Sequence, residues 1–237
     1  HDLIREFLLR SIDHTLKIEL HNKCSSWYQK SNDTPGFTIE MIFHLVSSKN
    51  MVEAAEIIIQ NGSSLISQGH MELLGLINSL EQDDLSSEVS TKVNHYKGEI
   101  LALLGKFEDA KEAFLHAQEM ASKGKDVSTQ AELLSALADI SLKQGNLDES
   151  LTMHRDALEI FIKQKDAIGA ARCYNNMGYI LRRKNDKSKA LESYAEVESI
   201  IKENNDSELL SSQLILARSL MDLGEIERAR DHALDAF

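Results

Sequence analysis

The sequence predicts an all-α protein, a solenoid of stacked antiparallel helical hairpins, from its composition, its scarcity of turn-forming proline and a repeated pattern. Leu, Ala, Glu, Lys and Ser dominate the 237 residues, with one proline and an aromatic fraction of 5%. A β-sandwich or barrel needs many turns and many β-branched or aromatic strand residues, so this composition disfavours it. A pattern of small residues recurs four times, which is typical of units that bury their apolar faces only against one another.

The four copies share one internal spacing. They begin at Gly98, Ala138, Gly178 and Ala217, which lie 40, 40 and 39 residues apart. Matching positions follow at offsets of 3, 7, 12, 16 and 19 residues, namely Leu101, Gly105, Ala110, Phe114 and Ala117 in the first copy, Ser141, Gly145, Ser150, His154 and Ala157 in the second, Leu181, Asn185, Ala190, Tyr194 and Val197 in the third, and Leu220, Gly224, Ala229, Ala233 and Ala236 in the fourth.

Each position has a physical role in a helical hairpin. A small residue at the start lets two antiparallel helices approach closely. Gly or Asn seven residues later takes the left-handed conformation that ends the first helix. The small residue at offset 12 packs the second helix back against the first. We expect the larger side chains of Phe114 and Tyr194 to fill the space between neighbouring hairpins.

Over about residues 86–237 this pattern resembles the tetratricopeptide repeat, which carries small residues at the eighth position of its first helix and the twentieth position of the unit. The family's unit has about 34 residues, whereas the units here have about 40. The extra residues fall in the polar stretches 122–128 and 163–166, and this longer form is similar to the repeats of kinesin light chains and related adaptors. The resemblance implies a right-handed superhelical solenoid. The alternative is a generic helical bundle whose spacing is accidental, and four copies in phase argue against it.

The N-terminal third carries weaker signals of the same kind. We expect a helix over 13–30, a hairpin over 38–48 and 51–61, and an extra amphipathic helix over 70–81, with a break at 31–36. The apolar faces of the first and last of these helices are predicted to carry Leu16, Leu20, Cys24 and Trp27, and Leu73, Leu74, Ile77 and Leu80. The predicted divisions are therefore 1–33, 34–85 and 86–237.

Residues 1–7, His-Asp-Leu-Ile-Arg-Glu-Phe, resemble the His-Asp-Leu motif that closes the winged-helix domain of signal-transduction ATPases with numerous domains. In some groups of that family the following segment is also similar, with a His and a Trp-Tyr pair (His21 and Trp27-Tyr28) before a helical hairpin. The resemblance implies that 1–33 holds the end of a winged-helix-like segment and a linking helix, and that His1 contacts a bound nucleotide in the off state. The alternative is that His1-Asp2 simply caps a helix.

No Gly-x-x-x-x-Gly-Lys-Ser/Thr loop occurs in the sequence, so we do not expect this chain to bind ATP by that mechanism. Because the chain begins with His1 rather than Met, within a structured motif, we expect it to be a fragment of a longer protein.

No motif for catalysis or metal binding is present. The nine histidines and two cysteines form no His-x-x-x-His, Cys-x-x-Cys or His-Glu-x-x-His pattern, and no Gly-x-Ser-x-Gly elbow occurs. We therefore expect no enzyme and no cofactor. We expect His95, His116 and His154 to be polar residues on the surface of the repeat helices. The net charge of −12 disfavours nucleic acid. The absence of a membrane-spanning apolar run, and two cysteines suited to a reducing compartment, predict a cytoplasmic protein.

The tetratricopeptide resemblance implies that the first helix of each unit lines a concave partner-binding surface. The candidate residues are Lys92 and His95 in the first unit, Lys143 in the second, Arg172, Asn175, Tyr179, Arg182 and Arg183 in the third, and Arg218 in the fourth. The three arginines of the third unit predict an acidic or carboxylate-bearing protein segment as partner, with Asn175 holding its backbone and Tyr179 giving an amphipathic contact. The alternative is that these arginines pair with neighbouring acids such as Asp139 and Asp222.

The last hairpin presents a small apolar face with Ala233 and Ala236, where natural arrays carry a polar cap. Either the repeats continue in a longer protein or this end associates with another copy. The sequence thus favours a partner-binding scaffold, the repeat arm of a larger regulatory ATPase. The alternative is a stand-alone adaptor that binds an extended peptide.

Overall fold

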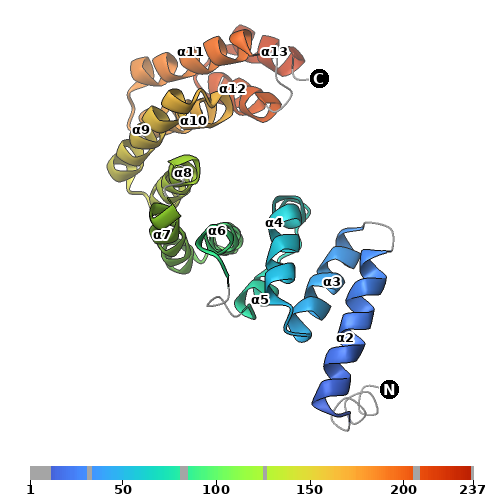
Figure 1. The fold of residues 1–237 in the computed structure, drawn as a ribbon. Coiled ribbons are helices and arrows are strands. Elements are labelled where there is room, and N and C mark those ends of the chain that lie inside the picture. The colour runs from blue at the N-terminus through green and yellow to red at the C-terminus, as the bar shows by residue number, and fades with distance from the viewer. Residues whose placement is uncertain (1–11, 31–33, 81–84, 125–126, 205–208, 236–237) are drawn as a thin grey trace. The chain divides into compact units, whose positions relative to one another are not determined.

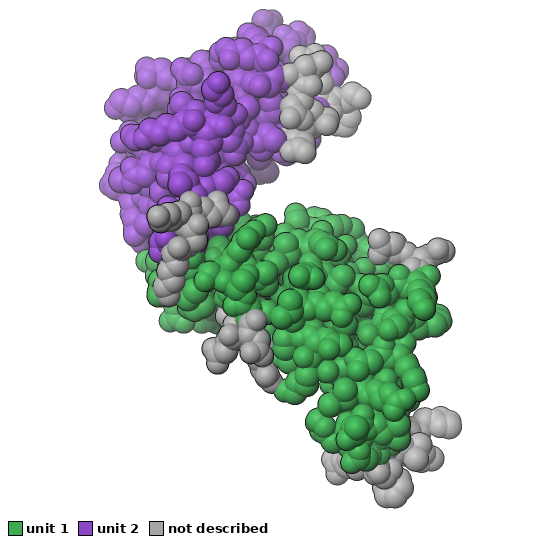
Figure 2. Space-filling model, in the orientation of Figure 1, with its two compact units in different colours: residues 1–120 green, residues 121–237 purple. Residues whose placement is uncertain are grey.

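The computed structural model of the chain describes residues 12–30, 34–80, 85–124, 127–204 and 209–235 (Figure 1). Every regular element among these residues is a helix, and the helices follow one another as antiparallel hairpins. The predicted all-α, tetratricopeptide-like fold is therefore confirmed. Contacts divide the chain into two compact units, residues 1–120 and 121–237 (Figure 2).

The described residues of the first unit form five helices and most of a sixth: α2 (His14–Gln29), α3 (Pro35–Ser47), α4 (Met51–Ser67), α5 (Leu73–Asn78), α6 (Ser87–Leu103) and α7 (Phe107–Gly124). Helix α2 starts where the Asp13 carboxylate accepts a hydrogen bond from the backbone N–H of Thr15 at 2.9 Å, and α3 starts with Thr34 as N-cap and Pro35 in its first turn. Helix α3 packs against α2 and α4, and α4 packs against α6. Their shared core is aliphatic, with Ile42, Ile58, Leu73, Ile77 and Ile100 fully buried.

The second unit contains α8 (Val127–Lys143), α9 (Leu147–Gln164), α10 (Ala167–Arg183), α11 (Lys187–Glu203), α12 (Leu210–Asp222) and α13 (Ile226–Asp235). They form three hairpins, α8/α9, α10/α11 and α12/α13, and α10 also contacts α8, α9 and α12. The first helices of consecutive repeats are thus neighbours, as the repeat pattern requires. Aromatic rings of Phe161 and Tyr194 are fully buried in this core.

The turns within the four repeats follow the predicted chemistry. Gly105, Gly145, Asn185 and Gly224 have φ values of 75°, 87°, 63° and 83°. In each turn the next residue donates its backbone N–H to the carbonyl at offset 3, for example Asn146 to Ser141 at 2.8 Å and Asp186 to Leu181 at 3.0 Å. This is the hydrogen bond of a Schellman motif, which satisfies the end of the first helix. The small residues at offset 12 are buried in all four repeats, which also confirms their packing role.

Several expectations need correction. The ring of Phe114 lies against Gly98, and that of Tyr194 against Gly178, so both rings fill space inside their own hairpin, a contact that was not predicted. His154 is 0% exposed instead of lying on the surface. The extra helix is α5, six residues instead of the twelve over 70–81, because residues 71–72 form a turn before it and residues 79–80 a turn and a bend after it.

The apolar stripe predicted on α2 is also placed differently, since Leu16, Leu20 and Trp27 are exposed in the part of the chain that the structure describes. The side of α2 that meets α3 carries His21 and Tyr28 instead, which contact His44. Of the described helices, none is long and apolar enough to cross a membrane.

Candidate partner-binding surface

Helix α10 carries a stripe of exposed polar and aromatic side chains. Arg172, Tyr179 and Arg183 are exposed and stand seven and four residues apart, which places them on one side of the helix. The Arg172 guanidinium lies 5.9 Å from the centre of the Phe161 ring. Among the described residues, no acid pairs with Arg172 or Arg183. Two of the predicted arginines are therefore cationic groups without a neighbouring counter-charge.

Helix α12, which packs against α10, carries further exposed side chains. Arg218 is exposed, and Leu214 and Met221 on the same stripe are 45% and 62% exposed. Leu214 and Met221 were absent from the predicted set, although they occupy the fifth and twelfth positions of the fourth unit. Mapping apolar as well as polar residues onto these positions would have found them. We call the six residues Arg172, Tyr179, Arg183, Leu214, Arg218 and Met221 the α10/α12 surface.

Arg182 connects the two helices rather than remaining available to a partner. Its guanidinium lies 3.0 Å from Oδ2 of Asp222 and 5.2 Å from the centre of the Tyr179 ring. For this residue the alternative interpretation holds, because the neighbouring acid neutralises its charge. Asp139 does not pair with an arginine in the same way. It accepts a hydrogen bond from Asn176 Nδ2 at 2.8 Å and lies 3.3 Å from Nε2 of the buried His154.

Asn175 is the predicted residue whose placement differs most from expectation. It is 2% exposed, and its Nδ2 donates to the backbone carbonyl of Ser212 at 3.1 Å. The amide therefore connects α10 to α12 instead of offering a free donor to a peptide backbone. Its Oδ1 is buried without a hydrogen-bond partner among the described residues.

The remaining candidates belong to other helices than α10 and α12. Lys92 and His95 belong to the first unit, where they lie 3.8 Å from Glu88 and 3.6 Å from Glu99. Lys143 is exposed at the end of α8 in the second unit. His1 lies outside the described residues.

The described residues contain no group of three or more His, Cys, Asp or Glu side chains suited to a metal ion. Cys24 and Cys173 are both free thiols, and burial raises the pKa of Cys173 to about 11. A thiol that is protonated and buried is a poor nucleophile. The arrangement on α10 and α12 is instead suited to recognition by charge and by apolar contact.

Comparison with known proteins identifies the repeats. Residues 90–163 and 129–203 match the family model of the tetratricopeptide repeat. The two matches overlap and together span residues 90–203. A search among curated proteins finds no match to the chain in sequence.

Solved structures share the fold of this chain. BtubC from P. vanneervenii is 14% identical, with 95% of this chain and 90% of that chain covered and a TM-score of 0.55. A Podosopora anserina putative kinesin light chain with TPR-like repeats is 17% identical over 81% and 94%, at 0.55. The Rap conjugation gene regulator of plasmid pLS20, in complex with the Phr* peptide, is 13% identical over 92% and 72%, at 0.63. At these identities the likeness concerns the fold alone.

Proposed function

We propose that this protein is an interaction scaffold that binds an extended acidic segment of a partner protein on the α10/α12 surface. The observation that carries the proposal is the exposure of Arg172, Arg183 and Arg218, which no described acid neutralises, beside exposed apolar side chains.

Charge supports an acidic partner. The chain has a formal net charge of −12, so most of its surface repels anionic segments. A local group of unpaired arginines attracts such segments to the α10/α12 surface. The guanidinium group binds carboxylates through two parallel hydrogen bonds, which gives direction as well as affinity. Arg182 is excluded from this role because Asp222 already binds it.

Apolar contact supports a protein segment over a small anion. Leu214 and Met221 flank Arg218 on α12, and Tyr179 stands between Arg172 and Arg183 on α10. Large exposed apolar side chains in a row with charged ones are typical of binding surfaces, where buried apolar anchors supply most of the affinity. The Rap regulator of pLS20 holds a Phr* peptide in its solved complex, so a protein of the same fold binds a peptide.

A selection from a random peptide library on the intact protein tests this proposal without assuming the partner. Selected peptides are expected to be enriched in Asp and Glu with at least one apolar residue, and to lose affinity at least tenfold for the variant Arg183→Glu/Arg218→Glu. Arg155→Glu is the matched control, because Arg155 is exposed on α9, away from this surface. Peptides without acidic enrichment, or with equal affinity for the double variant and the control, would refute the proposal.

The motif at residues 1–7 supports a second, wider context, in which this scaffold is the repeat arm of a regulatory ATPase. The sequence upstream of His1 in the parent reading frame decides it. A Gly-x-x-x-x-Gly-Lys-Ser/Thr loop followed by a winged-helix pattern is expected. A start codon close to His1 would leave the stand-alone adaptor.

Self-association is a third proposal and rests on the exposed Ile226 and Leu234 of α13. Sedimentation velocity over a wide concentration range tests it. Leu234→Glu is expected to abolish a concentration-dependent increase in mass, and a mass that stays monomeric at high concentration would exclude it.

A further inference from the structure

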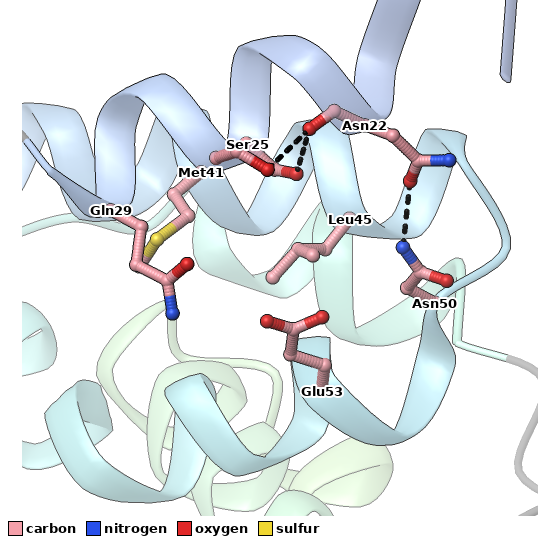
Figure 3. A pocket seen from close by; sticks show the side chains of 8 residues that line it. Asn22, Ser25, Gln29, Met41, Leu45, Asn50 and Glu53 are labelled. Atoms are coloured by element: carbon pink, nitrogen blue, oxygen red, sulfur yellow. Dashed lines mark hydrogen bonds between the residues drawn. The ribbon is translucent and has the colours of Figure 1, made fainter. Parts of the chain in front are cut away.

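A polar hollow in the first unit lies between α2 on one side and α3 and α4 on the other (Figure 3). Its volume is about 290 Å³. The residues that line it come from three helices and are Asn22, Ser25, Ser26, Gln29, Met41, Leu45, Asn50 and Glu53. None of these residues belongs to the α10/α12 surface, whose residues lie in the second unit.

The lining offers mainly hydrogen-bond acceptors, because most of its donors are already used. The hydroxyl groups of Ser25 and Ser26 both donate to the backbone carbonyl of Asn22, at 3.0 and 2.9 Å. Each hydroxyl oxygen can therefore only accept a further hydrogen bond.

The same holds for Asn50 on the opposite wall. Its Nδ2 donates to Oδ1 of Asn22 at 2.8 Å and to Oγ of Ser48 at 3.3 Å. The side-chain amide groups of Asn22 and Gln29 are the donors that remain among the lining residues.

Glu53 is the charged residue of the lining. Its side chain rises from α4 with the carboxylate turned toward the space beneath α2 (Figure 3). Among the described residues it has no hydrogen bond or ion pair of its side chain. An unpaired carboxylate beside hydroxyl acceptors makes the hollow favourable for a cation that donates hydrogen bonds.

The floor and the size restrict which cation fits. Met41 and the buried Leu45 form an apolar floor, against which a methylene chain packs well. The volume is at the lower limit of ligand pockets, roughly 300 Å³, so it admits one side chain and no large ligand. Acceptors on separate walls suit an ammonium, whose three N–H groups point in different directions, better than a planar guanidinium.

We propose that this α2/α4 pocket binds a primary alkylammonium group, with the methylenes on Met41 and Leu45 and the charge at Glu53. Two sources share this chemistry: a lysine side chain of a protein and a free diamine. The site is independent of the proposed scaffold function, because it uses other residues of another unit.

Titration of the intact ¹⁵N-labelled protein tests this. N-acetyl-lysine methylamide represents a chain-borne lysine, cadaverine a free diamine, and N-acetyl-norleucine methylamide the same methylene chain without charge. Saturable shifts of the Ser25, Leu45 and Glu53 amide signals are expected with either amine and not with the norleucine compound. The tighter of the two amines identifies the source. Tighter binding of N-acetyl-arginine methylamide than of both amines would overturn the ammonium assignment.

The variant Glu53→Gln is expected to weaken amine binding about tenfold, because it replaces a charge-assisted hydrogen bond with a neutral one. Glu56→Gln is the matched control, since Glu56 is exposed on the same helix but does not line the pocket. Glu53 is itself exposed, so both variants keep the fold, which circular dichroism checks. Equal loss in both variants would mean that the amine senses only the general negative charge, and absence of saturable shifts would mean that the pocket takes no amine. Either outcome refutes the proposal.

Discussion

The ring of Tyr194 lies so close to Gly178 that a Cβ atom on that glycine would stand 2.4 Å from ring atom Cε1. The two residues face each other across one hairpin, Gly178 on α10 and Tyr194 on α11, and the ring is fully buried. The first repeat has the same relationship between Gly98 and Phe114, where the shortest such distance is 2.5 Å. The second repeat carries Ala138 and His154, which has a smaller ring, at the two equivalent positions of the sequence. The size of one residue therefore limits the size of the other.

Gly178→Ala is expected to destabilise the protein by about 1–3 kcal/mol, the usual cost of overpacking a core. Alanine is the better helix former by about 1 kcal/mol, but its methyl group would meet the fully buried ring of Tyr194. Gly75→Ala is the control, because nothing lies within 4 Å of a Cβ there, and it is expected to be neutral or slightly stabilising. Urea unfolding followed by circular dichroism measures both.

A double-mutant cycle shows whether the ring is the cause. In a Tyr194→Leu background the ring is gone, so adding Gly178→Ala is expected to be neutral or stabilising. The same loss of stability in both backgrounds would contradict the packing argument.

Local turn chemistry made the hairpins predictable. The turns at Gly105, Gly145 and Asn185 need a positive φ value, which glycine and asparagine adopt with less strain than most residues. These residue types can therefore be recognised in the sequence. The small residues at offset 12 leave a similar trace, because any larger side chain would separate the two helices. Both features depend on contacts within one repeat.

The candidate site was predicted only in part, because its details depend on contacts between repeats. The helical period puts Asn175 near the stripe of Arg172 and Tyr179, but it does not tell which neighbouring helix covers it, and α12 does. The burial of His154 follows in the same way from the packing of its hairpin. The α2/α4 pocket exists because α2 turns Asn22 and Ser25 inward. The sequence predicted instead that Leu16, Leu20 and Trp27 of this helix face inward, and these residues are exposed.

Lys165→Gly is expected to stabilise the protein by a few tenths to about 1 kcal/mol. Lys165 ends α9 with φ of 59°, and a left-handed conformation costs a residue with a Cβ roughly 1–2 kcal/mol, which the entropy cost of glycine offsets in part. Lys163→Gly, inside the same helix, is expected to lose about 1 kcal/mol. Thermal unfolding compares the stability of the two variants. A loss of stability in both would show that the positive φ value of Lys165 causes no strain that glycine relieves.

The two cysteines are expected to react at very different rates with a thiol reagent such as DTNB. Cys24 is partly exposed, whereas Cys173 is buried with its pKa raised to about 11. Near pH 8 a thiol with that pKa is almost entirely protonated, and the thiolate is the reactive form. One thiol is expected to react in the native protein and the second only after unfolding in urea. Cys173 lies on α10, which packs against α8, so two fast thiols would show that the packing around α10 opens readily.

The attachment of α2 to α3 is expected to weaken as the pH falls. Nδ1 of His21 lies 2.7 Å from Nδ1 of His44, so one ring must donate and the other must accept, and protonation of both removes the acceptor. Burial lowers the pKa of both rings, and His21 lowers that of His44 further against an opposing effect of Glu40.

The sign of the effect follows from these directions. In the unfolded chain both histidines have a pKa of about 6.5, above their values in the folded protein. Their contribution to stability is therefore complete above about pH 6.5 and is lost as the pH falls from there through the lowered pKa values, because the unfolded chain binds more protons.

Trp27 is the single tryptophan of the chain and lies on α2, so its fluorescence during thermal unfolding reports on this helix. The midpoint is expected to drop between about pH 7.5 and about pH 5 in the wild type. The drop should be smaller in His44→Gln and unchanged in the exposed control His14→Gln, and an equal drop in all three proteins would assign the pH dependence to other groups.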